Sequence, residues 1–154
     1  MIRILTFLIV LLLSGASLNA QTVASEEEAV KGSIRRLFSG MFQADSSLAA
    51  SAFDRACIMQ TIKTANGQTS VQTGSVNSFL SMIAGAPRQR YDERIVFTYI
   101  HVDGPLASVW TDYQFYNGGV FSHCGVNSFQ LAKKGAEWKI VYLIDTRRKE
   151  PCKK

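Results

Sequence analysis

The last third of the chain alternates apolar and polar positions, and three turn-favouring dipeptides interrupt the alternation: Asp103-Gly104, Asn117-Gly118 and Lys134-Gly135. Alternation with a period of two on both sides of such dipeptides predicts β-strands joined as hairpins. The four predicted strands span residues 93–102, 106–116, 119–133 and 136–147. This segment therefore predicts an antiparallel, four-stranded meander.

The segment before the meander begins with helical spacing. Ser25-Glu26-Glu27-Glu28 is a capping box, in which the serine and the last glutamate satisfy free backbone N–H groups of the first turn. The apolar stripe that follows consists of Val30, Ile34, Leu37, Phe38, Met41 and Phe42. This pattern predicts an amphipathic helix with one buried face.

Three shorter elements are predicted between this helix and the meander. A second helix is capped by Asp45 or Ser46 and has an apolar face of Leu48, Ala49, Ala52 and Phe53. Residues 57–63 and 69–73 flank Asn66-Gly67 and predict a hairpin, and Ser75 caps a third helix that ends before Gly85. The order of elements predicts one α+β domain, in which a curved, mixed and mostly antiparallel sheet wraps around the N-terminal helices.

The first 20 residues have the layout of a secretory signal peptide: Arg3, a short apolar run, and small or polar residues ending at Ala20. A buried N-terminal helix is the alternative. We therefore expect a signal peptide at 1–20, a domain at 21–148 and a basic tail at 149–154. The expected location is the periplasm or the exterior, with no integral membrane segment after cleavage.

The formal net charge of +5 does not describe the predicted domain. Residues 21–146 contain eleven Lys or Arg and eleven Asp or Glu, so the excess lies in Arg3 and in the tail. A neutral domain lacks the basic face that nucleic-acid binding requires, so no nucleic-acid partner is expected. The tail is interpreted as a solvated terminus, the alternative being a contact with anionic lipid or glycan.

The chain has three cysteines, Cys57, Cys124 and Cys152. An odd number leaves at least one thiol free or paired with another molecule, and the spacings assign no disulfide. Cys57 and Cys124 fall inside predicted strands, where a small buried thiol is the favoured interpretation. No cysteine has metal-ligand spacing, and two histidines without further ligands predict no metal site and no metal cofactor.

Two-residue loops fix which residues of the meander share a face. In an antiparallel pair joined by such a loop, the residue numbers of any two opposed residues add up to the same value. Loops at the three dipeptides place Asp112 opposite His123 and Asn127 beside Tyr142 on one aromatic face. The predicted lining of the concavity includes Phe97, Tyr99 and Trp110, with Phe38 of the first helix. A three-residue loop with a bulge at Gly118-Gly119 is the alternative and would separate Asp112 from His123.

Asp112 and His123 are the candidate catalytic pair, because a carboxylate can orient an imidazole that titrates near neutral pH. The alternative is a structural cross-strand pair. Asn127 and Tyr142 could donate hydrogen bonds to a ligand, or they could satisfy each other. The opposite face, which includes Val109, Val126 and Val141, is apolar enough to predict a homodimer through the outer side of the sheet.

The chain resembles the nuclear transport factor 2-like superfamily, whose cystatin-like α+β fold is a cone with an internal pocket. The resemblance covers Ser25 to about Arg148 and rests on four segments: Trp110-x-x-Tyr113, residues 123–127 (HCGVN), residues 138–140 (WKI) and residues 145–148 (DTRR). An exported bacterial branch whose members are named lumazine-binding or SnoaL-like is the most similar. This superfamily includes enzymes and non-enzymes, so the fold does not fix the function.

The superfamily also includes ketosteroid isomerase, whose catalytic residues do not carry over. Its tyrosine would fall near Leu37 and its carboxylate base near Gln60 or Thr61. Its protonated aspartate would fall at Asn127, which alone could still donate a hydrogen bond. The resemblance therefore does not imply steroid isomerisation.

Three hypotheses follow. The first is an exported protein that binds an apolar or aromatic small molecule in the concavity, without catalysis. The second is a cofactor-free lyase or isomerase that uses His123 and Asp112. The third is a dimeric interaction module without a working pocket.

Overall fold

The computed structural model describes residues 24–152, so the predicted signal peptide lies outside the described residues. The N-terminal helix spans residues 24–43 and is followed by α2 (Ser46–Ala50) and, later in the chain, α3 (Val76–Ala84). Asp45 and Ser75 cap the two short helices, as the sequence predicts. Within residues 24–152, no helix is long and apolar enough to span a membrane.

Six strands form one sheet. In chain order they are β1 (Phe53–Ala65), β2 (Gln68–Gly74), β3 (Tyr91–Asp103), β4 (Leu106–Asn117), β5 (Val120–Lys134) and β6 (Glu137–Arg148). Their order in the sheet is β2-β1-β6-β5-β4-β3, and every pair is antiparallel except β1 with β6. The predicted α+β class with a curved, mixed and mostly antiparallel sheet is confirmed.

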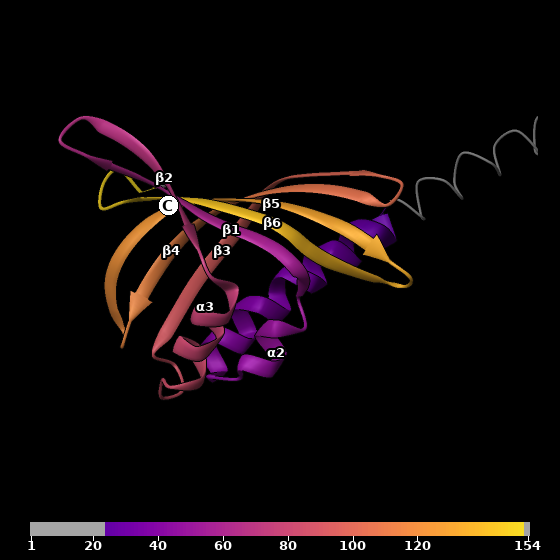
Figure 1. Ribbon diagram of the computed structural model, residues 1–154, viewed down its shortest axis with the longest axis horizontal. Coiled ribbons are helices and arrows are strands. Elements are labelled where there is room, and N and C mark those ends of the chain that lie inside the picture. Colours follow the sequence, from indigo (N-terminus) through magenta and orange to yellow (C-terminus); the bar gives the residue numbers. More distant parts are fainter. Residues whose placement is uncertain (1–23, 153–154) are drawn as a thin grey trace, which may run out of the picture.

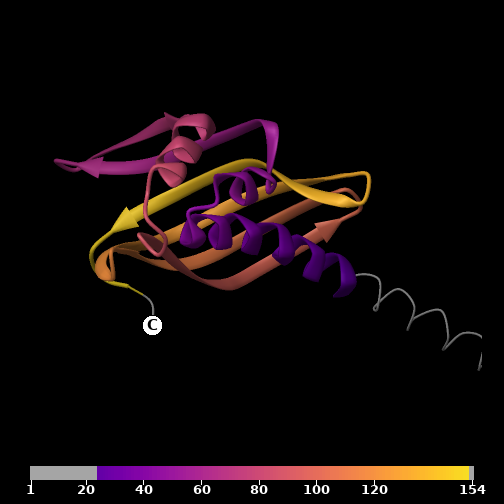
Figure 2. The same cartoon turned by 90° about the horizontal axis from the view of Figure 1, so that it is seen from below.

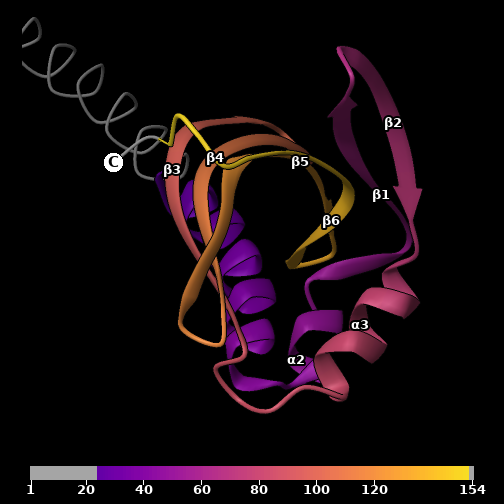
Figure 3. The same ribbon diagram turned by 90° about the vertical axis from the view of Figure 1, so that its left-hand side faces the viewer.

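The sheet curves around the helices (Figures 1 and 3), and the N-terminal helix runs along its concave face (Figure 2). Hydrogen bonds from the N-terminal half of the helix to β5 and β6 hold this contact in place. Glu26 accepts hydrogen bonds from Lys133 and from Trp138 Nε1, and Ser33 Oγ donates to the carbonyl of Trp138 at 2.8 Å. The core between helix and sheet is formed by side chains such as Ile34, Leu37, Phe129 and Ile140. These contacts fix the position of the helix on the sheet. The helix therefore forms a fixed wall of the space that remains between the two.

The second helix is shorter than predicted. It ends at Ala50, and Phe53 begins β1, where it pairs with Ile140 of β6. Phe53 remains buried, but as a strand residue packed edge-on against Phe79 of α3. An apolar residue is buried at the end of a helix and at the start of a strand alike, so the sequence pattern could not tell which of the two Phe53 belongs to.

The loops of the meander differ from the prediction by one residue each. Asp103, Asn117 and Lys134 are the last residues of their strands, and a glycine with positive φ begins each loop. Only Asn66-Gly67 forms the predicted loop, with positive φ at both residues. Primed turns require positive φ, which a glycine at the first loop position supplies without strain.

Each hairpin of the meander also contains one bulge, and the bulges reverse which side chains face the core. The extra residues are Thr98 in β3, Ser122 in β5 and Val141 in β6. As a result Asp112 lies opposite Val126, and His123 lies opposite Phe115. The predicted Asp112–His123 pairing is therefore wrong, and a bulge beside Gly118-Gly119 is the reason.

The same bulges move other predicted residues to the outer face. Tyr99 and Trp110 are opposed there and are 66% and 42% exposed. Tyr142 lies opposite Gln130 instead of beside Asn127. In the other direction, Val109 is 2% exposed and packs in the core, so it cannot contribute to an outer-face dimer as predicted.

The C-terminal segment is tied to the sheet by a disulfide between Cys124 of β5 and Cys152. The interpretation of Cys124 as a buried free thiol is therefore wrong, and the tail is covalently attached as far as Cys152. Cys57 remains a free, partly buried thiol, and burial raises its pKa to about 11.

Candidate functional site

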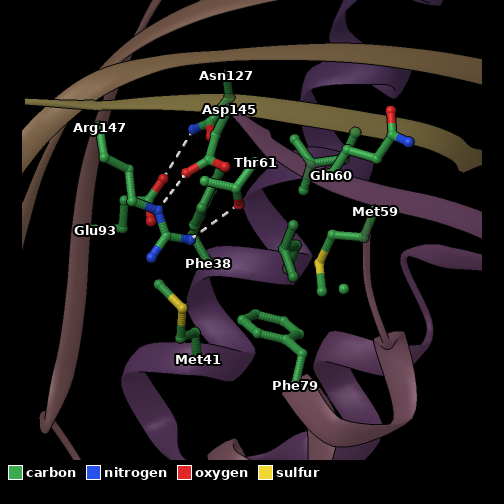
Figure 4. Close-up of a pocket in the computed structure, with 13 residues that line it drawn as sticks. Phe38, Met41, Met59, Gln60, Thr61, Phe79, Glu93, Asn127, Asp145 and Arg147 are labelled. Atoms are coloured by element: carbon green, nitrogen blue, oxygen red, sulfur yellow. Dashed lines mark hydrogen bonds and ion pairs between the residues drawn. The ribbon is translucent and has the colours of Figure 1, made fainter. Parts of the chain in front are cut away.

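A cavity lies between the concave face of the sheet, the N-terminal helix and α3. A narrow inner part of about 110 Å³ adjoins a wider outer part of about 570 Å³. Figure 4 shows the inner part, with apolar side chains on one side and polar side chains from the sheet on the other. The apolar side chains are Leu37, Phe38, Met41, Met59, Phe79 and Leu143. The cavity is thus apolar over most of its wall and polar at one end.

The first polar cluster at this end consists of Asn127 of β5 and the side chains that it contacts. Asn127 is 4% exposed, and its Nδ2 donates to Glu93 Oε1 at 2.8 Å and lies 3.4 Å from Thr111 Oγ1. Glu93 comes from β3 at the edge of the sheet, so its side chain reaches across the one intervening strand, β4, to meet the amide. The buried amide holds one carboxylate oxygen in place beside the cavity.

The second polar group is an ion pair within β6. Arg147 Nε donates to Asp145 Oδ2 at 2.8 Å, and Arg147 Nη2 lies 3.4 Å from Thr61 Oγ1 of β1. The two residues share a face because they are two positions apart in a strand. The Tyr113 hydroxyl donates to the Thr146 carbonyl at 2.9 Å and lies 3.4 Å from Asp145 Oδ2. Thus Asp145 is held from both sides.

Gly125 makes this arrangement possible. A β-carbon at position 125 would lie far inside van der Waals contact with the Thr146 carbonyl and 2.8 Å from Tyr113 Cε1. The Tyr113 ring therefore lies across the bare glycine and reaches β6. Glycine in a strand interior commonly marks such a close approach.

Burial changes the acid–base properties of the polar end. Desolvation raises the pKa of Glu93 from 4.5 to about 7, with the Asp145 charge adding to the effect and the Asn127 hydrogen bond opposing it. Desolvation also raises the pKa of Tyr113, so the phenol stays protonated. Burial and the Arg147 charge lower the pKa of His123, which favours the neutral imidazole. Near pH 7 Glu93 is therefore divided between its neutral and charged forms.

The structure brings together only some of the predicted site residues. Asn127 and Phe38 line the inner cavity and His123 lines the outer part, whereas Phe97 packs against the core and lines neither part, contrary to the prediction. Asp112 lines one hollow on the outer face, and Tyr99 and Trp110 line another. Tyr142 donates to Gln60 Oε1 at 2.7 Å rather than contacting Asn127. The predicted lining by Tyr99, Trp110 and Tyr142 is thus contradicted by the register.

Sequence reasoning missed Glu93 and gave Asp145 and Arg147 a different role. Glu93 stood at the edge of a predicted strand, although its spacing from Ile95 and Phe97 puts it on their face. In the sequence, Asp145 and Arg147 serve only as part of the DTRR segment on which the resemblance of the fold rests. Among residues 24–152, no three acidic, histidine or cysteine side chains are arranged to hold a metal ion.

Comparison with known proteins supports the fold and does not identify an activity. No family model and no curated protein matches the chain. An NTF2-like protein of unknown function from Shewanella baltica OS155 is 16% identical, with 82% of this chain and 97% of that one covered and a TM-score of 0.65. An NTF2-like protein with a cystatin-like fold from Novosphingobium aromaticivorans is 12% identical, with coverages of 86% and 88% and a TM-score of 0.67. The chain therefore has the NTF2-like, cystatin-like fold expected from its sequence.

Proposed function

We propose that this protein binds a small, mainly apolar molecule in the cavity between its helices and the concave face of its sheet. The observation that carries the proposal is the cavity itself, which has an apolar wall and a fixed polar end at Glu93, Asn127, Asp145 and Arg147. Small-molecule sites usually combine an apolar lining with a few oriented polar groups. The NTF2-like fold often forms pockets of this kind.

We also propose that the protein is exported. The expected signal peptide at residues 1–20 is the first support for this part of the proposal. The second is the disulfide between Cys124 and Cys152, because disulfides persist in oxidising compartments and are rare in the cytosol.

A direct test uses N-phenyl-1-naphthylamine, an uncharged dye whose fluorescence rises in apolar pockets. The wild-type protein is expected to bind the dye with saturation at one site. Met59→Trp is expected to weaken binding about tenfold or more, because Met59 lines both parts of the cavity and an indole would fill it. Fluorescence titration gives both dissociation constants.

Val71→Trp is the matched control, since it adds the same indole to the exposed strand β2. Its dye affinity should equal that of the wild type. An equal loss of dye affinity in both variants, or the absence of saturable dye binding by the wild type, would contradict the proposal.

A second candidate function is proton-transfer catalysis of the isomerase or lyase type. It is favoured by Glu93, a cavity carboxyl with a pKa of about 7, which can take up or release a proton at neutral pH. This replaces the Asp112–His123 dyad, whose members lie on opposite faces of the sheet. The dyad cannot operate as a hydrogen-bonded pair in this fold.

Exchange of the α-protons of 2-tetralone in D₂O, followed by NMR, tests this candidate. Wild-type protein should accelerate exchange above the buffer rate with an apparent pKa near 7. Glu93→Gln should abolish the acceleration, and Asp112→Asn should leave it unchanged. Acceleration that survives in Glu93→Gln would exclude Glu93 as the catalytic base.

A further inference from the structure

We propose that the ligand of the cavity carries one positive charge, as a protonated amine on an apolar or aromatic skeleton, and that Glu93 is its counter-ion. The inference rests on the proposed function, because it concerns the charge of the molecule that the cavity takes. Three observations support it: the hydrogen-bond partners of Glu93, the net charge of the residues that line the cavity, and the apolar and aromatic side chains of its wall.

Glu93 is a carboxylate with a neutral partner. Its Oε1 accepts from the Asn127 amide at 2.8 Å. Its Oε2 makes no hydrogen bond or ion pair with any residue between 24 and 152, although Glu93 lines both parts of the cavity. Arg147, the nearby cation, gives its Nε to Asp145 instead. One carboxylate oxygen is therefore available to a ligand.

The charged residues that line the cavity include one more anion than cation. Two carboxylates and one guanidinium line it, those of Glu93, Asp145 and Arg147, so its net charge is −1 when Glu93 is ionised. Buried charges require compensation. A protonated amine makes the sum zero, whereas a carboxylate ligand would make it −2.

The other titratable groups facing Glu93 do not remove this deficit. Tyr113 of β4 stays protonated and His123 of β5 favours its neutral form. On the other side of Glu93, Arg35 of the N-terminal helix shares Glu28 with Lys31, and Asp92 pairs with Arg94. Arg35 is not among the charges that shift the pKa of Glu93. Within residues 24–152, no cation forms an ion pair with Glu93.

The wall also suits a cation with an apolar body. Phe38 and Phe79 contribute aromatic rings, and Met41 and Met59 contribute polarizable sulfur atoms. Aromatic rings attract ammonium groups as well as apolar surface. An aryl amine can thus place its ring on this wall and its charge at Glu93.

The test compares three ligands of similar shape that differ in charge: 2-naphthylmethylamine, 2-naphthalenemethanol and 2-naphthoate. At pH 8, where Glu93 is mostly ionised, the wild type is expected to bind the amine about tenfold more tightly than the alcohol and to bind the acid least. Glu93→Gln should remove the preference for the amine and leave alcohol binding unchanged. Asp103→Asn, a change at the exposed end of the same strand, should keep the wild-type order.

Calorimetry on the unaltered protein gives an independent readout. Amine binding at pH 7 should release roughly half a proton, seen as a binding enthalpy that differs between phosphate and Tris buffers. Equal affinity for amine and alcohol, or tighter binding of the acid, would overturn the charge assignment while leaving the cavity as a binding site. Failure of all three ligands to bind would contradict the proposed function itself.

Discussion

Replacing Gly125 by alanine is expected to destabilise the folded protein by about 3 kcal/mol or more, or to prevent folding. The added methyl group would overlap the Thr146 carbonyl, which belongs to the backbone of the neighbouring strand and cannot rotate away. It would also press against the Tyr113 ring, whose hydroxyl is bonded to that same carbonyl at 2.9 Å. Relief of the overlap requires β5 and β6 to separate locally.

Chemical unfolding of wild type and variant measures this effect, and Gly32→Ala is the control. Gly32 lies in the N-terminal helix, and a β-carbon there would meet no atom within 4 Å. Because alanine favours a helix interior by about 1 kcal/mol over glycine, this variant should be equally or more stable than the wild type. Wild-type stability of Gly125→Ala would contradict the packing of Tyr113 across β5.

Replacing Glu93 by glutamine is expected to stabilise the protein above pH 7 by up to about 3 kcal/mol and to leave it unchanged near pH 4. The pKa of Glu93 rises from 4.5 to about 7 on folding, so the folded state binds this proton more tightly than the unfolded state. Wild-type stability should therefore fall as the pH rises from 4.5 to 7 and remain lowered above 7. Glutamine keeps the shape and has no charge to desolvate.

Melting temperatures measured from pH 4 to pH 9 test this expectation. The fall in wild-type stability that comes from Glu93 should disappear in Glu93→Gln and persist in Asp103→Asn, a change at the exposed end of the same strand. Identical profiles for wild type and Glu93→Gln would show that Glu93 is not held in a desolvating site. A carboxylate that costs stability at neutral pH is more readily explained by a ligand than by folding, because functional sites are commonly held at a cost to stability.

Much of the fold could be predicted because its signals are local. Ser75 and Asp45 cap helices, Asn66-Gly67 closes a hairpin, and the apolar stripe that includes Leu37 packs on the sheet as expected. The parallel pairing of β1 with β6 carries no such local signal, since strands far apart in the sequence form it. Side-chain direction in the meander depended on the bulges at Thr98, Ser122 and Val141, which alternation does not reveal.

The bulges also decide which residues of the candidate site could be predicted from the sequence. Asn127 alternates without interruption with the buried Phe129 and Leu131, so its inward direction could be predicted. The bulge at Ser122 reverses the predicted direction of Asp112 relative to His123. Glu93 meets Asn127 only because an edge strand curves over the concave face, and that curvature is a property of the whole sheet. The raised pKa of Glu93 then depends on burial by residues from several elements.

The central claim is that the cavity on the concave face is the binding site, and NMR titration of the ¹⁵N-labelled protein with N-phenyl-1-naphthylamine tests it most directly. We predict saturable shifts of the backbone amides of Met41, Met59 and Glu93, with those of Val96, Tyr99 and Trp110 unaffected. Shifts confined to the outer-face residues would contradict the claim and would identify the outer side of the sheet as the interaction surface.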